Sequence, residues 1–387
     1  MKKLGICVVI YNNNFGSMLQ SYATMKYLDK MGIEYDVIRY KKKYTPLFIL
    51  KSIPRLLNKN IWIDKKRVIQ KKVGMLLHKD IKKANSMRNK LFDEFRKKYF
   101  VNLADFTHGY KNLKEVGKKY DAYLVGSDQL WLPSGLATNF YNLNFVADEK
   151  LKVSYASSFG VKKIPFYQIK RTRDYLNRIQ YISTRENSGR DIVKELTGRD
   201  VPVVVDPTLL FNKDEWLEIL ENKNKYQEKY IFAYFLGGNI GYRDEVRKLA
   251  KEKGMKIVTI RHMDQFVSAD NEFGDYAPYD VGPEEFVNLI RNAEYICTDS
   301  FHGMLFSIIN HKKFIVFNRY SDKSKTSKNS RIESLCNNLG LEDRRYKEGD
   351  IISEMDKNIN YDDVEKKIES MRDKSKNYLK EALKDII

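Results

Sequence analysis

The sequence predicts an α/β fold with two domains, each a parallel β-sheet covered by helices, and a cleft between them. The first observation behind this prediction is that short apolar runs alternate with helical patterns along most of the chain, which is typical of parallel sheets. The second is the length of 387 residues, which fits two domains. The third is a hydrophobic fraction of 42%, which is ample for buried cores.

The first domain is expected over residues 1–206. Leu4–Ile10 is a continuous apolar run, as in strands that are buried on both faces, and the asparagines that follow it argue against a signal peptide. The pattern then predicts a helix over Ser17–Met31, which Gly32 ends. The other expected strands are Tyr35–Ile38, Ala122–Val125, Val153–Ala156, Tyr181–Thr184 and Val201–Val205, with helices over about 166–178 and over 187–196.

The second domain is expected over residues 207–360, because the turn Asp206-Pro207-Thr208 has the character of a domain boundary. Its expected strands are Tyr230–Leu236, Lys256–Ile260, Tyr295–Thr298 and Phe314–Phe317, and its expected helices are Arg243–Lys253, Glu284–Asn292 and Gly303–Asn310. Residues 361–387 are predicted to form a C-terminal amphipathic helix that packs back on the N-terminal domain.

A basic, mostly helical insertion is expected in the N-terminal domain at about 40–115, where the alternation is interrupted. The net charge is +19, and residues 39–100 hold 20 of the 70 lysines and arginines but only 4 of the 51 acidic residues. Apolar residues and Trp62 lie among the basic ones, which is typical of a helix on an anionic membrane surface. A solvated, lysine-rich insertion is the alternative. No nucleic acid is expected as a partner, because the excess charge is confined to one segment.

Several classes of protein and site lack support in the sequence. The three cysteines are too few and too far apart for a disulfide framework or a zinc site, and we expect no metal. No run of about 18 apolar residues predicts a membrane-spanning helix. A dinucleotide fingerprint, a P-loop, a nucleophile elbow and an HExxH motif are all missing. We therefore expect a cytoplasmic protein that is neither a hydrolase nor a kinase.

The candidate site lies in loops that follow the predicted strands, because open parallel sheets bind ligands beyond the carboxyl ends of their strands. The first loop contains Asn13, Asn14 and Gly16. Gly16 permits a tight turn whose backbone N–H groups suit an anion or a sugar hydroxyl at a helix N-terminus. An ordinary asparagine-rich helix cap is an equal alternative.

Two further loops carry candidates for contact with a sugar. Asp128 is a candidate general base for a sugar hydroxyl, and the N-cap of the next helix is its alternative role. Ser127 and Gln129 flank it, and Trp131 is placed either to stack on a sugar ring or to fill the core. Ser158 belongs to a small-residue loop that suits close approach of a ligand.

Two further positions suit an anion. Arg185 follows the strand Tyr181–Thr184, where a guanidinium fits bidentate binding of carboxylate or phosphate, and a surface salt bridge is its alternative role. His302 lies between a predicted strand and a helix, beside Ser300 and Gly303. An imidazole there fits a general acid or an anion ligand, and a core or capping histidine is the alternative.

Seven motifs, in order over roughly residues 4–345, resemble those of polysaccharide pyruvyl transferases. Each motif alone is weak evidence, but together and in register they are strong evidence. They are residues 5–23, Val125–Trp131, Ser154–Gly160, Ile182–Glu186, Val205–Leu210, Thr298–Gly303 and the block 330–341.

The resemblance implies a glycosyltransferase-B-like fold, with two Rossmann-like domains that face each other across a cleft. It also implies transfer of pyruvate from phosphoenolpyruvate to two hydroxyls of one sugar, as a cyclic ketal, with no cofactor beyond this co-substrate. Family members use an arginine that matches Arg185 and a histidine that matches His302. The resemblance therefore assigns Arg185 to binding the donor anion and His302 to binding or protonating the donor. Asp128 is the expected base on the acceptor side.

One motif departs from the family pattern. Many family members carry Arg-Leu-His where this chain has Ser300-Phe301-His302. The missing arginine would bind the donor anion, so a cation from elsewhere is needed beside Ser300 and Gly303. Arg261, Arg331 and Lys323 are the candidates.

The expected acceptor is a saccharide, lipid-linked, in capsule, exopolysaccharide or cell-wall glycan assembly. Such an acceptor gives residues 40–100 a reason to contact an anionic membrane surface at the inner face of the cytoplasmic membrane. Two other functions remain open. A sugar-nucleotide-dependent glycosyltransferase would place Glu333 and Arg331 near a ribose or diphosphate. A non-catalytic member would bind glycan or act as a scaffold, although the glycine-rich loops argue mildly against it.

Overall fold

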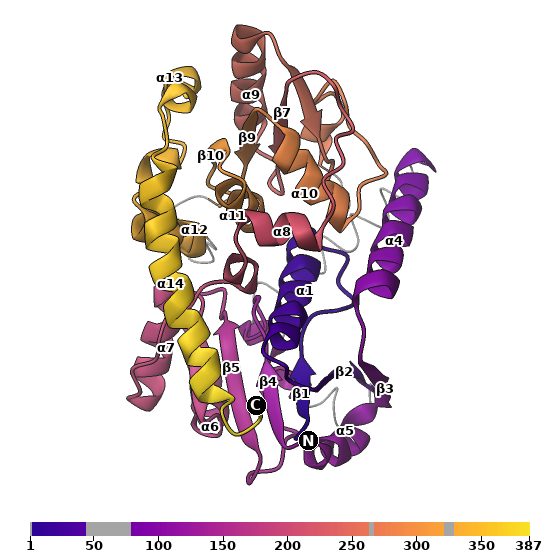
Figure 1. Cartoon of the computed structure of the whole chain (residues 1–387), viewed down its shortest axis with the longest axis vertical. Helices are drawn as coiled ribbons and strands as arrows, with labels where there is room; N and C mark the ends of the chain where they lie inside the picture. Colours follow the sequence, from indigo (N-terminus) through magenta and orange to yellow (C-terminus); the bar gives the residue numbers. More distant parts are fainter. Residues whose placement is uncertain (1, 44–78, 263–266, 321–328) are drawn as a thin grey trace.

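The computed structural model describes residues 2–43, 79–262, 267–320 and 329–387. Its elements form two α/β halves, one above the other in Figure 1. Each half is built around a sheet whose neighbouring strands are all parallel. The predicted α/β fold with two parallel sheets is therefore confirmed.

The N-terminal sheet has, in the described part of the chain, the strand order β3-β2-β1-β4-β5-β6. Strand β2 lies on one side of β1 and β4 on the other, so the strand order reverses between β1 and β4. Ligands bind at the carboxyl ends of the strands at such a switch point. The strands are β1 (Leu4–Cys7), β2 (Tyr35–Lys41), β3 (Leu103–His108), β4 (Ala122–Val125), β5 (Leu151–Ser157) and β6 (Tyr181–Thr184). The helices are α1 (Phe15–Lys30), α4 (Lys79–Tyr99), α5 (Gly109–Lys119), α6 (Ile169–Asn177) and α7 (Asn187–Thr197).

The C-terminal sheet has the order β10-β9-β7-β8 over the residues described. Here β7 separates β9 from β8, so this sheet has its own switch point at the ends of β7 and β9. Its strands are β7 (Tyr230–Tyr234), β8 (Lys256–Thr259), β9 (Tyr295–Thr298) and β10 (Lys313–Val316). Its helices are α8 (Lys213–Ile219), α9 (Ile240–Lys253), α10 (Pro283–Asn292), α11 (Phe301–Ile309), α12 (Ser330–Leu339) and α13 (Ile351–Asp356), and α14 (Tyr361–Ala382) follows.

The basic segment at about 40–115 contains a strand as well as helices. β3 pairs with β2 at the edge of the N-terminal sheet, which the sequence did not predict because this strand is mostly exposed and has no continuous apolar run. The helix α4 packs on both halves, since Phe92 contacts Phe15 and Lys98 pairs with Glu284 at 3.0 Å. The apolar stretch with Trp62, on which the membrane prediction rests, lies outside the described residues.

A predicted strand at Val201–Val205 is wrong. Only Val203 makes an isolated bridge, to Thr184 at the end of β6. Pro202 lies within the run and has no N–H to donate to a sheet. The segment therefore crosses the edge of the N-terminal sheet as extended chain on its way to Asp206.

The C-terminal helix α14 runs along both halves (Figure 1). Near its start the hydroxyl of Tyr361 donates to the carbonyl of Lys312 at 2.5 Å, in the C-terminal half. Near its end the hydroxyl of Tyr378 donates to the carbonyl of Ser154 in β5 at 2.8 Å. Between them Ser375 accepts a hydrogen bond from the backbone of Val205. The helix therefore connects the C-terminal half to the N-terminal sheet.

The two halves also meet through aromatic packing next to the switch points. Phe15, in the first turn of α1, stacks on Phe286 of α10 with ring centroids 4.7 Å apart. Phe15 also meets the edge of Tyr234 at the end of β7. Both sheets contribute to this buried core, so their carboxyl edges are held toward each other. Within the described ranges, none of the helices has the length and apolar character needed to cross a membrane.

Candidate active site

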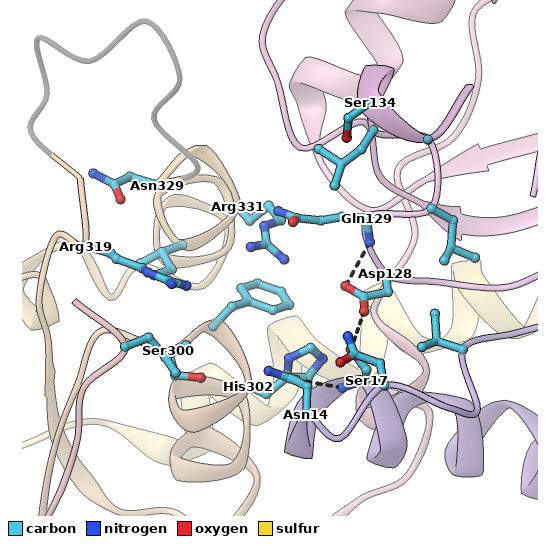
Figure 2. A pocket seen from close by; sticks show the side chains of 18 of the residues that line it. Asn14, Ser17, Asp128, Gln129, Ser134, Ser300, His302, Arg319, Asn329 and Arg331 are labelled. Atoms are coloured by element: carbon cyan, nitrogen blue, oxygen red, sulfur yellow. Dashed lines mark hydrogen bonds between the residues drawn. The ribbon is translucent and has the colours of Figure 1, made fainter. Parts of the chain in front are cut away.

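A cavity of about 470 Å³ lies between the two halves (Figure 2). The loops after β1 and β4 form its wall on the N-terminal side, and the loops after β9 and β10 together with α12 form the opposite wall. This is the carboxyl edge of both sheets, where the sequence placed the candidate site. Its polar lining includes Asn14, Ser17, Asp128, Gln129, Ser134, Ser300, His302, Arg319, Asn329 and Arg331.

Asp128 contributes a carboxylate to the N-terminal wall. Its backbone has φ of 84°, a left-handed conformation that a residue other than glycine keeps only where its surroundings hold it. Ser17 donates to Oδ2 at 2.6 Å and the backbone N–H of Gln129 donates to Oδ1 at 2.8 Å. Burial raises the pKa of Asp128, but Arg185, His302 and Ser17 together outweigh it and leave this pKa below its ordinary value. The carboxylate is therefore ionised at neutral pH and able to accept a proton.

His302 lies where the two halves come closest. Ser300 caps α11 by accepting from the backbone of Gly303 at 3.2 Å, and this cap starts the helix one residue before His302. The imidazole Nε2 lies 3.6 Å from a carboxylate oxygen of Asp206, and the ring packs against the α-carbon of Gly16. His302 is thus held by groups from both halves while it lines the cavity.

Arg185 lies beneath the cavity wall instead of on it. Its guanidinium Nη1 donates to Asp206 at 2.6 Å and to Ser127 at 3.3 Å, and Glu186 lies 3.9 Å from Nε. Its side chain is only 1% exposed, and Phe301 covers it with the ring centroid 4.8 Å from Cζ. Asp206 is itself fully buried, and its pKa is held far below the ordinary value because His302 and Arg185 outweigh the effect of burial. The sequence expected Arg185 to contact the donor, but the structure pairs it with a buried carboxylate.

Two other arginines do line the cavity. Arg331 lies beside the same aromatic residue, with Cζ 5.1 Å from the Phe301 centroid, and its buried Nε has no hydrogen-bond partner among the described residues. Burial, with Arg185 nearby, lowers the pKa of Arg331 to about 10, so it remains a cation at neutral pH. Arg319 lines the same wall. Among the described residues neither guanidinium forms an ion pair within 4.0 Å; the carboxylate of Asp299, which lines the same wall, accepts from the backbone of Leu236 and Gly237 at 2.6 and 2.7 Å. The cavity therefore holds two cations that are available to an anion.

The family model for polysaccharide pyruvyl transferases matches residues 14–321, most of the chain. The chain belongs to the polysaccharide pyruvyl transferase family. The family resemblance predicted from the seven motifs is thus confirmed. No curated protein matches the sequence.

Solved structures support the fold of this family member. The S. aureus MnaA–UDP structure has a TM-score of 0.52 at 12% identity, covering 100% of this chain and 98% of that one. A putative UDP-N-acetylglucosamine 2-epimerase from Listeria monocytogenes has a TM-score of 0.51 at 10% identity, covering 99% and 91%. A further UDP-N-acetylglucosamine 2-epimerase has a TM-score of 0.53 at 12% identity, covering 99% and 95%. At these identities the likeness concerns the fold alone, and it confirms the predicted glycosyltransferase-B-like arrangement of two Rossmann-like halves.

Several of the predicted site residues do meet at the cavity of this pyruvyl transferase family member. Asn14 caps α1 by accepting from the backbone of Ser17 at 3.1 Å, which confirms the helix cap, and it also lines the cavity. Gln129, Asp128, Ser300 and His302 also line it. The hydroxyl oxygen of Ser300 accepts the capping hydrogen bond of α11, and the residue carries no charge that could take the place of the missing family arginine. Gly303 lies behind it, where a β-carbon would come to 2.7 Å from Thr298.

Other predicted residues lie away from the cavity. Trp131 is 4% exposed and packs on Phe159 and Tyr175, so of its two predicted roles the structure supports the core. Ser158 is buried and donates to Glu186 at 2.7 Å. Ser127 lies under the cavity, in the buried network described above.

Three other candidate polar residues, on two loops and on α12, are also engaged elsewhere. Asn13 donates to Asn89 and accepts from Arg96, both in α4. Arg261 donates to the hydroxyl of Tyr279 at 2.7 Å and does not line the cavity. Glu333 pairs with Arg345 at 3.6 Å. Lys323 lies outside the described residues.

The sequence analysis missed Arg319 and Ser17. Arg319 follows β10 as Arg185 follows β6, so the rule that singled out one of them would have found the other. Ser17 was counted only as the start of a helix, and its bond to Asp128 joins residues 111 positions apart, which no local pattern reveals. In the ranges described, no three His, Cys, Asp or Glu side chains are grouped to hold a metal ion, and all three cysteines are buried and free.

Proposed function

We propose that this protein transfers pyruvate from phosphoenolpyruvate to two hydroxyls of one sugar, forming a cyclic ketal and releasing phosphate. The observation that carries the proposal is the pairing of groups across the cavity: Arg319 and Arg331 line one wall and the carboxylate of Asp128 lines the other. Phosphoenolpyruvate brings a carboxylate and a phosphate, and two guanidiniums without a protein carboxylate suit both.

The chemistry needs a proton donor, a base and stabilisation of anions. The C3 methylene of the donor gains a proton, and C2 takes on cationic character. One sugar hydroxyl then attacks C2 and loses its proton to the base. The second hydroxyl closes the ketal as the C2–O bond to phosphate breaks, and its proton leaves with the phosphate. Asp128 has the ionised carboxylate expected of the base. His302 is the candidate proton donor or anion ligand, and Arg319 and Arg331 stabilise the leaving phosphate.

The departure at Ser300 is offset in this proposal by Arg331 and Arg319. Both guanidiniums line the wall to which Ser300 belongs, and both are free of protein carboxylates in the described part of the chain. In this proposal the donor anion is therefore held by arginines from outside the motif. No cofactor and no metal take part in the proposed reaction.

The proposed acceptor is a lipid-linked saccharide of a capsule, exopolysaccharide or cell-wall glycan. It would be met at the inner face of the cytoplasmic membrane, with the basic segment 40–100 against anionic lipid. The charge of that segment supports this, and residues 44–78 of the segment lie outside the described residues.

The test combines donor binding with turnover. Calorimetry with phosphoenolpyruvate should show binding to the wild-type protein, and phosphate should be released when lipid-linked saccharides are added. Arg331→Gln and Arg319→Gln should each weaken donor binding about tenfold or more, since each removes a charged contact. Arg190→Gln, at an exposed pair with Asp191, is the matched control and should bind normally.

Two results would contradict the proposal. One is absence of both phosphoenolpyruvate binding and phosphate release. The other is thermal protection by sugar nucleotides without protection by phosphoenolpyruvate, which would favour a sugar-nucleotide-dependent glycosyltransferase.

A further inference from the structure

A second cavity of about 380 Å³ adjoins the candidate active site. The two cavities share Val9, Asn12, Thr138 and Tyr141 in their walls. All the residues that line the second cavity come from the N-terminal half, near the ends of β1 and β2 and from the segment 138–141. It therefore opens from the side of the site that carries Asp128, away from Arg319 and Arg331.

The lining of the second cavity is aromatic and basic. Tyr40 packs on Phe140 with ring centroids 5.4 Å apart, and Phe140 packs on Tyr141 at 4.8 Å. Arg39 and Lys42 add positive charge, and none of the described residues that line this cavity is acidic. Rigid rings with a few polar groups at their edges are the usual composition of a small-molecule subsite.

Two aromatic rings at the rim of this cavity are exposed. Tyr11 is 52% exposed and Phe106 is 44% exposed, and their rings stack with centroids 5.4 Å apart. The guanidinium of Arg39 lies 4.4 Å from the Phe106 centroid and 3.5 Å from the Tyr11 hydroxyl, to which it donates. The guanidinium of Arg96 also lies 5.9 Å from the Tyr11 ring. The exposed parts of both rings are therefore accessible to a ligand, held in place by two arginines.

We propose that the second cavity and the Tyr11–Phe106 stack form a saccharide subsite, which holds the sugars next to the one that is modified. The proposal rests on the proposed function, because it identifies the Asp128 side as the acceptor side. The apolar C–H faces of a pyranose stack on Tyr11, while its hydroxyls reach Asn12, Thr138 and Tyr141 at the shared wall. Arg39 and Lys42 favour a saccharide with a carboxylate or phosphate over a neutral one.

The location argues for a saccharide acceptor over the donor. The donor needs two cations without carboxylate partners, and Arg319 and Arg331 supply these in the first cavity but do not line the second. Asp128 lines the first cavity, and its carboxylate is close enough to Tyr141 in the shared wall to act on the pKa of that phenol, so a hydroxyl of a sugar bound at the wall would meet it.

The experiment measures saccharide binding on a printed array of bacterial surface glycans and donor binding by calorimetry with phosphoenolpyruvate. Tyr11→Ala removes the exposed ring, and Tyr11→Phe retains it. Thr138→Trp fills the shared wall from the side of the segment 138–141. Phe166→Ala is the matched control, because Phe166 is 84% exposed and lines neither cavity.

The wild-type protein, Tyr11→Phe and Phe166→Ala should bind the same glycans, with acidic glycans preferred over neutral ones. Tyr11→Ala and Thr138→Trp should weaken that binding about tenfold, the scale of one lost aromatic contact with its buried area. Phosphoenolpyruvate affinity should be unchanged in Tyr11→Ala, Tyr11→Phe and Phe166→Ala, whose residues do not line the first cavity. Tyr11→Ala tests the proposal even if Thr138→Trp fails to fold, because Tyr11 is half exposed.

The proposal is overturned if the wild-type protein binds no glycan on the array, or if Tyr11→Ala binds glycans as the wild type does. It is also overturned if Tyr11→Ala weakens binding of nucleotides to the protein but leaves binding of glycans unchanged. Failure of the proposed function gives another result. In that case phosphoenolpyruvate does not bind the wild-type protein, while glycans still bind in a way that depends on Tyr11.

Discussion

The imidazole of His302 lies so close to the α-carbon of Gly16 that a β-carbon there would come to 2.0 Å from Nδ1. Gly16 belongs to the first turn of α1 and His302 to the first turn of α11, so the N-termini of helices from the two halves converge at the cavity. Helix N-termini favour negative charge, and their convergence adds to Arg319 and Arg331. The glycine thus sets how closely the two halves approach at the site.

Gly16→Ala should therefore separate His302 from Asp206 or push the halves apart. Forcing a methyl group into a packed contact costs about 1–3 kcal/mol. We expect a lower unfolding free energy in urea by this amount and a loss of phosphate release. Gly349→Ala, at an exposed position with ordinary backbone geometry and no contact closer than 3.8 Å, should change neither.

The double variant Gly16→Ala/His302→Ala isolates this contact. With the ring removed, the methyl group meets no imidazole, so its additional cost should vanish relative to His302→Ala alone. An equal cost of Gly16→Ala in both backgrounds would show that the clash lies elsewhere.

Asp206→Asn should destabilise the fold. The variant leaves the buried guanidinium of Arg185 without its 2.6 Å partner, and breaking a buried ion pair costs about 3–5 kcal/mol. The lowered pKa of Asp206 also shows that its ionised form stabilises the folded state. This stabilisation is present at neutral pH and is lost as the pH falls through and below the ordinary carboxyl pKa. Urea unfolding at pH 7 measures the difference. Asp191→Asn, which breaks an exposed pair with Arg190, should change stability by less than about 1 kcal/mol.

Asp128→Asn should lower turnover about 10²-fold or more if this carboxylate is the base, with phosphoenolpyruvate affinity unchanged or higher. The pKa of Asp128 lies below its ordinary value, so protonation of this carboxylate should not lower the rate between neutral pH and about pH 5. Ser17→Ala removes a hydrogen bond that favours the ionised form and should move the acid limb of the pH–rate profile to higher pH. A profile that is the same in Ser17→Ala and wild type would argue against Asp128 as the base.

Phosphoenolpyruvate affinity should fall as the pH rises through about 10, because Arg331 loses its charge near its lowered pKa of about 10. The phosphate ester is already doubly ionised above about pH 7, so the charge of the ligand does not change in this range. Calorimetry at pH 8 and at pH 10.5, with circular dichroism to confirm folding, measures the effect. In Arg331→Gln, phosphoenolpyruvate affinity should differ little between pH 8 and pH 10.5. If the affinity still falls as in the wild type, a group other than Arg331 causes the pH dependence.

Much of the architecture follows from the sequence because its signals are local. Buried parallel strands need continuous apolar runs such as Leu4–Cys7 and Tyr230–Tyr234, and the loops after such strands meet at one edge of the sheet. Asn14, Asp128 and His302 could therefore be assigned to one cavity. The edge strand β3 was not predicted, because it is partly exposed and has no continuous apolar run.

The sequence by itself determined the two parallel sheets, the family and the edge at which the site lies, because these depend on periodicity and on motifs in register. Only the tertiary structure decided which arginines face the cavity. Arg185 and Arg331 are equally charged in the sequence, but Arg185 is paired with the buried carboxylate of Asp206, while Arg331 lines the cavity. Such pairing depends on distances between residues far apart in the chain, and no local pattern contains those distances.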